Sequence, residues 1–430
     1  MRIIRLLLFL LVFPPSLLLN STILAQNTNS ARLDTVKILM MEEKYKISLA
    51  VLDSVLENDS TNAAAYYYKG LCYQELSNYQ KASEALIKAS FYKPDDINLM
   101  VSTGNNLMAS GRISQAEDIL FKALLLDSSN TKACLSLGKI YMQEQKWEKA
   151  LKIYNILLTE DSTNSFYYVQ AAKCNSSIGN IDEAIIDYQI AHKLNKFNIH
   201  TIMELSYLYY MQDKLISAIR IVNDGLAVYP ASAEIWTRKG DVLLKMKKYP
   251  EAIICYGNSI KFGDSSLTNY RNMGICYYWT DMYDSAVTKL KAAIKINDKD
   301  PSAYFYLGAS YKNLNDYEKA IKNFLAAADH LKNNLLSEIY TQLGASYYSK
   351  NKCREVIKYY KEALEENPQK AEINFYLAAA YEHFYEDKSV AINYYKKFLD
   401  DSVKVDKKLV NYAEERVKAL TEKNFMKSKR

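Results

Sequence analysis

The spacing of hydrophobic and polar residues along this chain is that of short amphipathic helices. Apolar residues recur at spacings of three and four within segments of about a dozen residues, and polar clusters separate the segments. This spacing gives each segment one apolar stripe when it is coiled as a helix. The pattern therefore predicts an all-α protein that is built from many short helices.

Small residues return along the chain at a fixed interval. Glycines are separated by 34 residues or a multiple of it, apart from a last step of 36: Gly70, Gly104, Gly138, Gly240, Gly274, Gly308 and Gly344. Alanines follow twelve residues after most of them, as Ala82 follows Gly70 and Ala320 follows Gly308. Small side chains let two helices approach closely, whereas a larger one would force them apart. Each unit is therefore predicted to be a helix pair in contact at these two positions.

The residues around the small positions resemble the tetratricopeptide repeat family, whose unit is 34 residues long. The resemblance is carried by the run Tyr304-Phe305-Tyr306-Leu307-Gly308 with Tyr311, Tyr317, Ala320, Phe324 and Ala327, and again by Trp236, Gly240, Tyr249, Ala252 and Tyr256. It implies a right-handed superhelical α-solenoid of about eleven helix-turn-helix repeats. Counted in phase, the repeats begin near 29, 63, 97, 131, 165, 199, 233, 267, 301, 337 and 371, and the solenoid covers 26–404.

The ends of the helices and of the solenoid are also readable. Asn, Asp or Ser precedes most repeats, which suits the N-cap of a first helix. After the last repeat, Val405, Leu409, Ala413, Val417 and Leu420 form one apolar stripe. We expect a capping helix over 405–422, which would shield the last repeat, and a basic tail over 423–430.

The first 25 residues have the pattern of a secretory signal peptide. Arg2 and Arg5 precede an apolar run, and Ile23 and Ala25 suit a signal peptidase that cleaves after Ala25. The run contains Pro14 and Pro15 and is short for a membrane span, although an uncleaved anchor remains the alternative. No cysteine precedes Cys72, so we expect no lipoprotein anchor. The sequence predicts a periplasmic or secreted protein with no other membrane contact.

Composition narrows the classes of partner. The formal charge of +6 is spread over 55 basic and 49 acidic residues, which does not indicate a nucleic-acid binder. The six cysteines show no metal-ligand spacing and fall at small packing positions. Cys255 and Cys276 form the only pair for which we consider a disulfide.

The chain lacks the patterns on which catalysis usually depends. It has no GxxxxGK[ST], GxGxxG, HExxH or GxSxG motif. Its four histidines, His192, His200, His330 and His383, do not pair with cysteine or with one another at metal-ligand spacing. We therefore predict a protein that is not an enzyme and binds no cofactor or metal.

The family resemblance places the binding groove on the first helix of each repeat, at positions 2, 5, 9, 12 and 13 of the unit. Carried over by phase, the predicted partner-binding residues are His200, Met203, Tyr207, Tyr210, Met211, Arg271, Tyr278, Trp279, Phe305, Tyr348 and Phe375. Aromatic residues, Met and Arg are enriched at binding hot spots. The family's clamp for chaperone C-termini is absent, because Val101 stands where the Lys beside Asn105 is required.

These observations predict an exported scaffold that binds a protein partner in its concave groove, with a role in assembling envelope complexes by family analogy. The partner is expected to be a peptide segment or helix with apolar and acidic residues. A carbohydrate- or small-ligand-binding receptor is the alternative, because Tyr278 and Trp279 could stack on sugar rings. Self-association through the groove or the terminal repeats is a further alternative.

Overall fold

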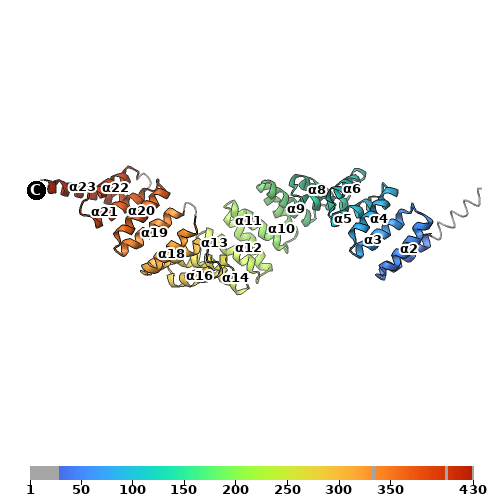
Figure 1. The fold of residues 1–430 in the computed structure, drawn as a ribbon, viewed down its shortest axis with the longest axis horizontal. Helices are drawn as coiled ribbons and strands as arrows, with labels where there is room; N and C mark the ends of the chain where they lie inside the picture. The colour runs from blue at the N-terminus through green and yellow to red at the C-terminus, as the bar shows by residue number, and fades with distance from the viewer. Residues whose placement is uncertain (1–28, 332–334, 402–404, 429–430) are drawn as a thin grey trace, which may run out of the picture. The chain divides into compact units, whose positions relative to one another are not determined.

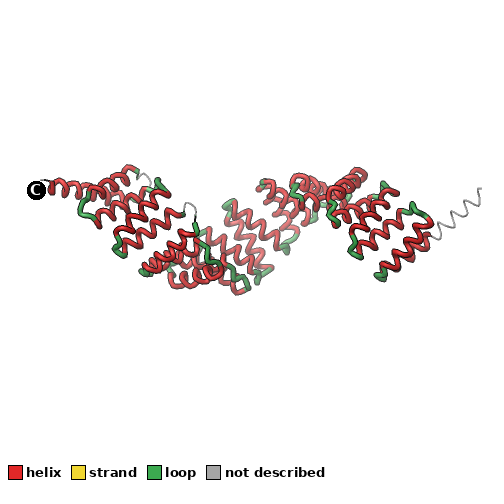
Figure 2. Tube along the Cα trace, in the orientation of Figure 1, coloured by secondary structure: helices red, strands yellow, loops and turns green. Residues whose placement is uncertain are grey.

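The protein folds into a succession of short α-helices joined by tight turns. The computed structural model describes residues 29–331, 335–401 and 405–428, and these ranges contain helices and no strand (Figure 2). The predicted signal peptide lies outside the described residues. The observed helix pairs confirm the prediction of an all-α fold made of helix-turn-helix repeats.

The chain divides into two compact units, Met1–Thr201 and Ile202–Arg430 (Figure 1). The first holds a helix over 29–41 and then α2 Tyr45–Asn58, α3 Ala63–Glu75, α4 Tyr79–Tyr92, α5 Ile97–Ala109, α6 Ile113–Leu126, α7 Thr131–Gln143, α8 Trp147–Glu160, α9 Ser165–Ile178 and α10 Ile181–Leu194. Helix α11, Ile199–Met211, begins in the first unit and ends in the second. The second unit continues with α12 Leu215–Val228, α13 Ala233–Lys245, α14 Tyr249–Lys261, α15 Leu267–Trp279, α16 Tyr283–Ile296, α17 Pro301–Asn313, α18 Tyr317–Asp329, α19 Leu336–Ser349, α20 Cys353–Glu366, α21 Ala371–Phe384, α22 Ser389–Asp400 and α23 Lys407–Ser428.

Each helix packs mainly on the helices that come directly before and after it in the chain. Within the first unit α3 contacts α4 and α4 contacts α5; within the second, α15 contacts α16 and α16 contacts α17. Contacts between helices two places apart, such as α15 with α17, are fewer. Within each unit the core is therefore assembled from neighbouring helices, as expected for a repeat protein.

The predicted N-caps close the first helices of the repeats. The side chain of Asn62 accepts a hydrogen bond from the backbone N–H of Ala65, and Asp300 accepts one from Ala303 at 2.7 Å. The same arrangement occurs at Asp96, Asn130, Asn164, Asn198, Ser232 and Ser266. These bonds satisfy backbone N–H groups that have no partner inside the helix, and they confirm the sequence prediction.

The turn inside each of the first ten helix pairs contains one residue in the left-handed region. The residue has φ between 56° and 60° at Glu43, Ser77, Gln145, Asp213, Lys247, Asp281, Asn315 and Asn351, and glycine supplies it at Gly111 and Gly179. In the fourth pair, α7 with α8, the N–H of Lys146 donates a hydrogen bond to the carbonyl of Tyr141 at 2.8 Å. This is the Schellman motif, in which a glycine would be the least strained residue.

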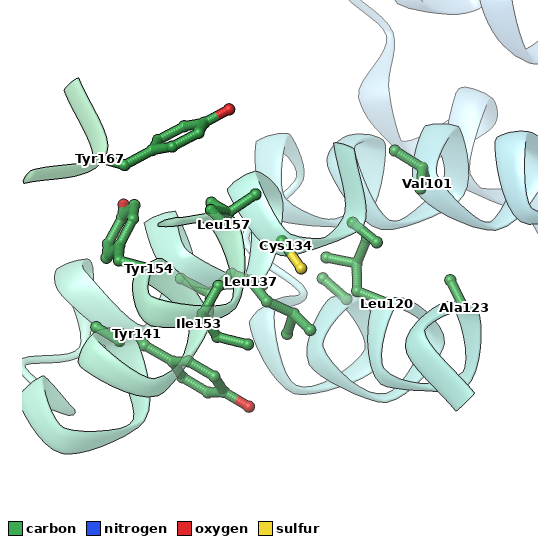
Figure 3. Close-up of a cluster of buried hydrophobic side chains, with 14 of the residues drawn as sticks. Val101, Leu120, Ala123, Cys134, Leu137, Tyr141, Ile153, Tyr154, Leu157 and Tyr167 are labelled. Atoms are coloured by element: carbon green, nitrogen blue, oxygen red, sulfur yellow. The ribbon is translucent and has the colours of Figure 1, made fainter. Parts of the chain in front are cut away.

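A large side chain of the second helix covers the small residue of the first helix. In the first unit, a Cβ atom placed on Gly138 would lie 3.1 Å from the ring of Tyr154. Tyr154 belongs to the buried cluster of Figure 3, together with Leu137 and Leu157. The equivalent partners in the second unit are Gly240 with Tyr256 and Gly308 with Phe324. The small positions are thus contact points between helices, as the repeat spacing predicted.

The last helix, α23, packs on the final repeat. Ala413 and Leu420 of α23 are buried in one cluster with Phe375, Tyr395 and Phe398 of α21 and α22. Arg416 of α23 forms an ion pair with Glu382 of α21. The helix therefore covers an apolar face that would otherwise meet water.

The cysteines are all reduced in the structure. Cys72, Cys134, Cys174, Cys255 and Cys276 are buried, and Cys353 is half-buried. Cys255 and Cys276, the pair considered for a disulfide, remain separate thiols. Burial raises the pKa of the Cys255 thiol to about 11 and of the Cys276 thiol to about 12, which keeps both unreactive near neutral pH.

Candidate functional site

Most of the predicted partner-binding residues lie on the first helices of the repeats in the second unit. We call this face the first-helix surface; it is formed by α11 from Ile202 onward and by α13, α15, α17, α19 and α21. Four of the predicted residues are well exposed on it: Tyr207 by 40%, Met211 by 59%, Trp279 by 51% and Tyr348 by 38%. Exposed aromatic and methionine side chains of this kind are available for contact with a partner.

Trp279 belongs to an aromatic cluster at the end of α15. Its ring is stacked on Tyr249, with 6.0 Å between the ring centroids, and lies edge-on to Tyr278 at 5.3 Å. Tyr278 in turn contacts Tyr306 of α17 at 5.4 Å. Burial raises the pKa of Tyr278, so its hydroxyl remains protonated. Because its neighbours fix its orientation, Trp279 can contact a ligand with little loss of side-chain entropy.

Two of the predicted tyrosines carry cations on their rings. The Nζ atom of Lys245 lies 4.4 Å from the ring centroid of Tyr210 and donates a hydrogen bond to the Tyr210 carbonyl at 2.7 Å. The guanidinium of Arg238 lies 5.2 Å from the ring centroid of Tyr207. Such cation–π contacts hold positive charge beside exposed aromatic rings. The first-helix surface can therefore attract apolar and acidic groups at the same place.

Arg271 has a different role from the one predicted. Its Nη1 atom bonds the Asp300 carboxylate at 2.9 Å, and its Nε donates to Asn272 at 3.2 Å. Asp300 is buried and also caps α17. Arg271 therefore joins two neighbouring repeats, and its charge is already matched inside the protein.

Phe375 is a second departure from the prediction, because it is not on the surface. The side chain is only 9% exposed and packs against Tyr395, Phe398 and Tyr412. Tyr412 comes from α23, so the final helix covers the position that the repeat phase had placed in the groove. Phe375 is a core residue of the last repeat.

Met203, Phe305 and His200 contribute less to the exposed first-helix surface than the residues above. Met203 is half-buried against the cluster of Val222, Leu226 and Ile235, and Phe305 is half-buried against Phe324. His200 is exposed, but it belongs to the first unit and is therefore not part of the first-helix surface.

Sequence reasoning missed a polar cluster beneath the first-helix surface. Asp241 Oδ1 accepts hydrogen bonds from the Tyr256 hydroxyl at 2.8 Å and from Asn272 Nδ2 at 3.1 Å. The Nε atom of Arg238 is buried nearby without a hydrogen-bond partner. The sequence shows Asp241 and Asn272 one and two positions from the small residues Gly240 and Gly274, which is where consecutive helices pack closely. Burial raises the pKa of the Asp241 carboxyl, and its hydrogen bonds and nearby arginines offset this only in part.

We expect this raised pKa to make stability depend on pH in a predictable way. An Asp whose pKa is higher in the folded state stabilises the fold at low pH, and this contribution is lost as pH rises through the folded-state pKa. Asp241→Asn keeps the acceptor oxygen but cannot ionise. The urea midpoint of the variant, relative to the unaltered chain, should therefore increase as pH rises above about 4, the value of a free Asp. A difference between the two midpoints that stays constant from pH 4 to pH 8 would contradict the assignment.

A second group of charges follows along the same surface. Lys312 of α17 donates a hydrogen bond to Gln342 of α19 at 2.8 Å, and burial lowers the pKa of its ammonium. Glu338 accepts hydrogen bonds from Lys370 at 2.6 Å and from Gln342 at 2.7 Å. Burial alone would raise the pKa of Glu338, but these donors lower it. The charges are matched to one another, and they join consecutive repeats.

The described residues offer no site for a metal ion, since no three His, Cys, Asp or Glu side chains converge among them. Among the helices that the structure describes, none is long and apolar enough to cross a bilayer. The chemistry on the first-helix surface is that of contact: aromatic rings, a methionine and cations.

Comparison with known families supports the repeat assignment. Models described as tetratricopeptide repeat match residues 107–173, 233–262, 289–322 and 337–370. The chain is 22% identical to BBSome complex member BBS4 of Bos taurus, over 80% of this chain and 61% of that protein. It is 21% identical to the mitochondrial import receptor subunit TOM70 of Homo sapiens, over 65% of this chain and 48% of that protein. The chain thus spans about half to three fifths of the length of these relatives.

Among solved structures, the chain is similar to one in the APC/C hetero-tetramer Cut9–Hcn1, with a TM-score of 0.45 and 14% identity over 88% of this chain and 95% of that one. The family matches, the 34-residue interval and the helix pairs agree. They identify the chain as a tetratricopeptide repeat protein.

Proposed function

We propose that the chain is a non-enzymatic, exported scaffold that binds a protein partner through the first-helix surface of its second unit. The exposure of Trp279, fixed in place by Tyr249, is the observation that carries the proposal. A large aromatic ring that is half exposed and held by its neighbours is the residue type that dominates binding energy at protein interfaces. BBS4 is named as a member of a complex and TOM70 as a receptor subunit, which supports a role in assembly.

The partner is proposed to be a segment with both apolar and acidic residues. Tyr207 and Tyr210 offer apolar rings, and Arg238 places positive charge beside Tyr207. Lys245, which lies beside Tyr210, is already paired with Asp213 at 3.2 Å. Arg271 adds little to this attraction, because Asp300 already neutralises it. An acidic residue of the partner would therefore be received near α11 and α13, and its apolar residues would extend toward Trp279.

Export and a role in envelope complexes are proposed from the first 25 residues of the sequence. The basic start, the apolar run and the small residue at Ala25 direct a chain into the secretory pathway. The test is to find the protein by cell fractionation and to sequence its N-terminus. A start at Gln26 in the envelope fraction supports export with cleavage, and a start at Met1 in the cytosol contradicts export.

A photo-crosslinking experiment in intact cells tests the binding surface. A crosslinking amino acid is placed at Met211 on the first-helix surface and, as a control, at Ile254 on a second helix, where exposure is 62%. We expect one envelope protein to be captured from position 211 and not from position 254. Trp279→Ala should then weaken binding to that partner by about thirtyfold, as expected for loss of a hot spot. Unchanged affinity would refute the proposal.

A receptor for carbohydrate is the second candidate, favoured by the same exposed indole. A sugar ring could stack on Trp279, as apolar sugar faces do on aromatic rings. A glycan array with the unaltered chain and with Trp279→Ala separates the two functions. A glycan signal that is lost in the variant supports the receptor function. An array without any signal favours the function as a protein-binding scaffold.

A further inference from the structure

A different surface, in the first unit, carries an apolar trough that the proposed function does not use. It lies between the second helices of two consecutive repeats, α6 and α8, and has a volume of about 790 Å³. It is an open trough, bounded by a helix on each long side. A volume of this order is typical of sites that receive several large side chains or a ligand.

The trough reaches from solvent to the core. Its floor is formed by Leu137, Tyr141 and Ile153, which are 0%, 7% and 8% exposed. Its edge on α6 is formed by Phe121 and Leu125, which are 53% and 71% exposed. Two large apolar side chains one helical turn apart are therefore exposed to water beside an apolar floor. Their exposure is unfavourable in free energy, and burial under a partner would remove this unfavourable term.

The repeat architecture does not require these two residues to be apolar. We compare the seven repeats that begin at residues 131 to 337. The residues equivalent to Phe121 in these repeats are Asn155, Gln189, Asn223, Gly257, Lys291, Leu325 and Lys361. The position of Leu125 holds Thr159, Lys193, Ala227, Lys261, Lys295, Asp329 and Glu365. Polar residues stand at both positions in four of these seven repeats, so the fold does not require apolar residues there. The preceding repeat carries another exposed apolar pair at the same positions, Ile87 and Phe91.

Charge around the trough is unevenly matched. At one end, Lys146 and Lys149 form ion pairs with Glu117 at 3.3 and 3.5 Å. Lys122 on the α6 side and Lys152 on the α8 side also line the trough, and neither forms an ion pair with the residues that the structure describes. The α6 edge thus carries both a cation, Lys122, and a carboxylate, Asp118, whereas the α8 edge carries the cation Lys152, which an acidic residue of a partner can match.

We propose that this trough binds an amphipathic helix of a partner protein, one that carries two large apolar residues three or four positions apart and acidic residues beside them. A helix in a groove between two helices buries one face and leaves its own polar face in water. A small apolar ligand fits less well, because such ligands bury most of their surface and this trough is open along its length. The chain would then hold two different partners on two different units.

Selection from a peptide library tests the proposal. The probe is a phage-displayed library of helical peptides of about 18 residues, which is roughly the length of α6 plus one turn. Peptides are selected on the full chain and counter-selected on the variant Phe121→Asn/Leu125→Lys, whose new residues this chain already uses at the same repeat positions. Circular dichroism and a thermal transition confirm that the variant is folded.

The proposal predicts the sequence pattern and the affinities of the selected peptides. We expect acidic peptides with paired apolar residues that bind the double variant at least about thirtyfold more weakly. Lys152→Glu, which leaves the apolar strip intact, should weaken them by about three- to tenfold, and Trp279→Ala should leave them unchanged. Four outcomes would each overturn the proposal. Trp279→Ala could abolish peptide binding, the selected peptides could be basic, the trough could bind a fatty acid in place of peptides, or the selection could yield no specific peptide. Loss through Trp279→Ala would place those peptides on the first-helix surface, whereas the other outcomes leave the proposal for that surface unaffected.

Discussion

Replacing Gly240 by valine is expected to lower the free energy of unfolding by about 3 kcal/mol or more, which is at the upper end for an overpacked core. A Cβ atom at this position would lie 2.7 Å from a ring carbon of Tyr256. The ring cannot move aside, because it is fully buried and its hydroxyl is held by Asp241 and Asn272. Valine adds two methyl groups beyond that Cβ, so α13 and α14 must separate.

The effect should be local, since a repeat is stabilised by its neighbours alone. Hydrogen exchange read by mass spectrometry is expected to show loss of protection in α13, α14 and the helices next to them, with α3 to α8 unchanged. Gly257→Ala is the matched control on α14: its Cβ would meet Met273 at 3.8 Å, an ordinary contact. That variant should be more stable by up to about 1 kcal/mol, because alanine favours a helix over glycine. Equal effects of the two substitutions would contradict this account of the small positions.

Removing the final helix is expected to produce the second large effect. Deleting residues 405–430 takes away Tyr412, Ala413 and Leu420, which cover Phe375 and its neighbours. It also leaves Glu382 without Arg416. A terminal repeat without its cap exposes an apolar face and frays. We expect hydrogen exchange in α21 and α22 to become about a hundredfold faster, and the shortened chain to elute as larger species on gel filtration.

A shorter deletion separates the cap from the tail. Removing 424–430 leaves Tyr412, Arg416 and Leu420 in place, so exchange in α21 and α22 should stay as it is in the full chain. If the longer deletion also leaves α21 protected, the buried cluster around Phe375 does not depend on α23.

The sequence was sufficient to predict the features that repeat. The spacing of small residues, the N-caps and the helix pairs each recur in phase, so many weak signals support the same interpretation. Asn62 and Asp300, for example, accept the backbone bonds that their positions predicted. A feature that occurs in unit after unit depends on local geometry, which a single sequence contains.

Features that depend on one particular neighbour were harder to predict. Phe375 holds a groove position by phase, yet α23 covers it. The apolar stripe after the last repeat predicted a capping helix but not which residues of that repeat it would cover. Arg271 was expected to be available to a partner, but Asp300 lies at the start of the next repeat and binds it. The trough between α6 and α8 was missed because Phe121 and Leu125 continue an ordinary apolar helix pattern. They are distinguished by the exposure of their side chains and by the polar residues that stand at the same positions of several later repeats.

The contacts between consecutive helices also bear on how the chain reaches its fold. Because substantial packing joins helices one or two places apart, no segment has to find a distant partner, and such low contact order favours rapid folding. A chain that is exported as proposed would leave its channel N-terminus first, and each helix pair could close as soon as it emerged. At every stage the newest pair would show an apolar face that the following pair covers. The apolar face of the last repeat would be covered only when α23 emerged, so that repeat would stay vulnerable until then.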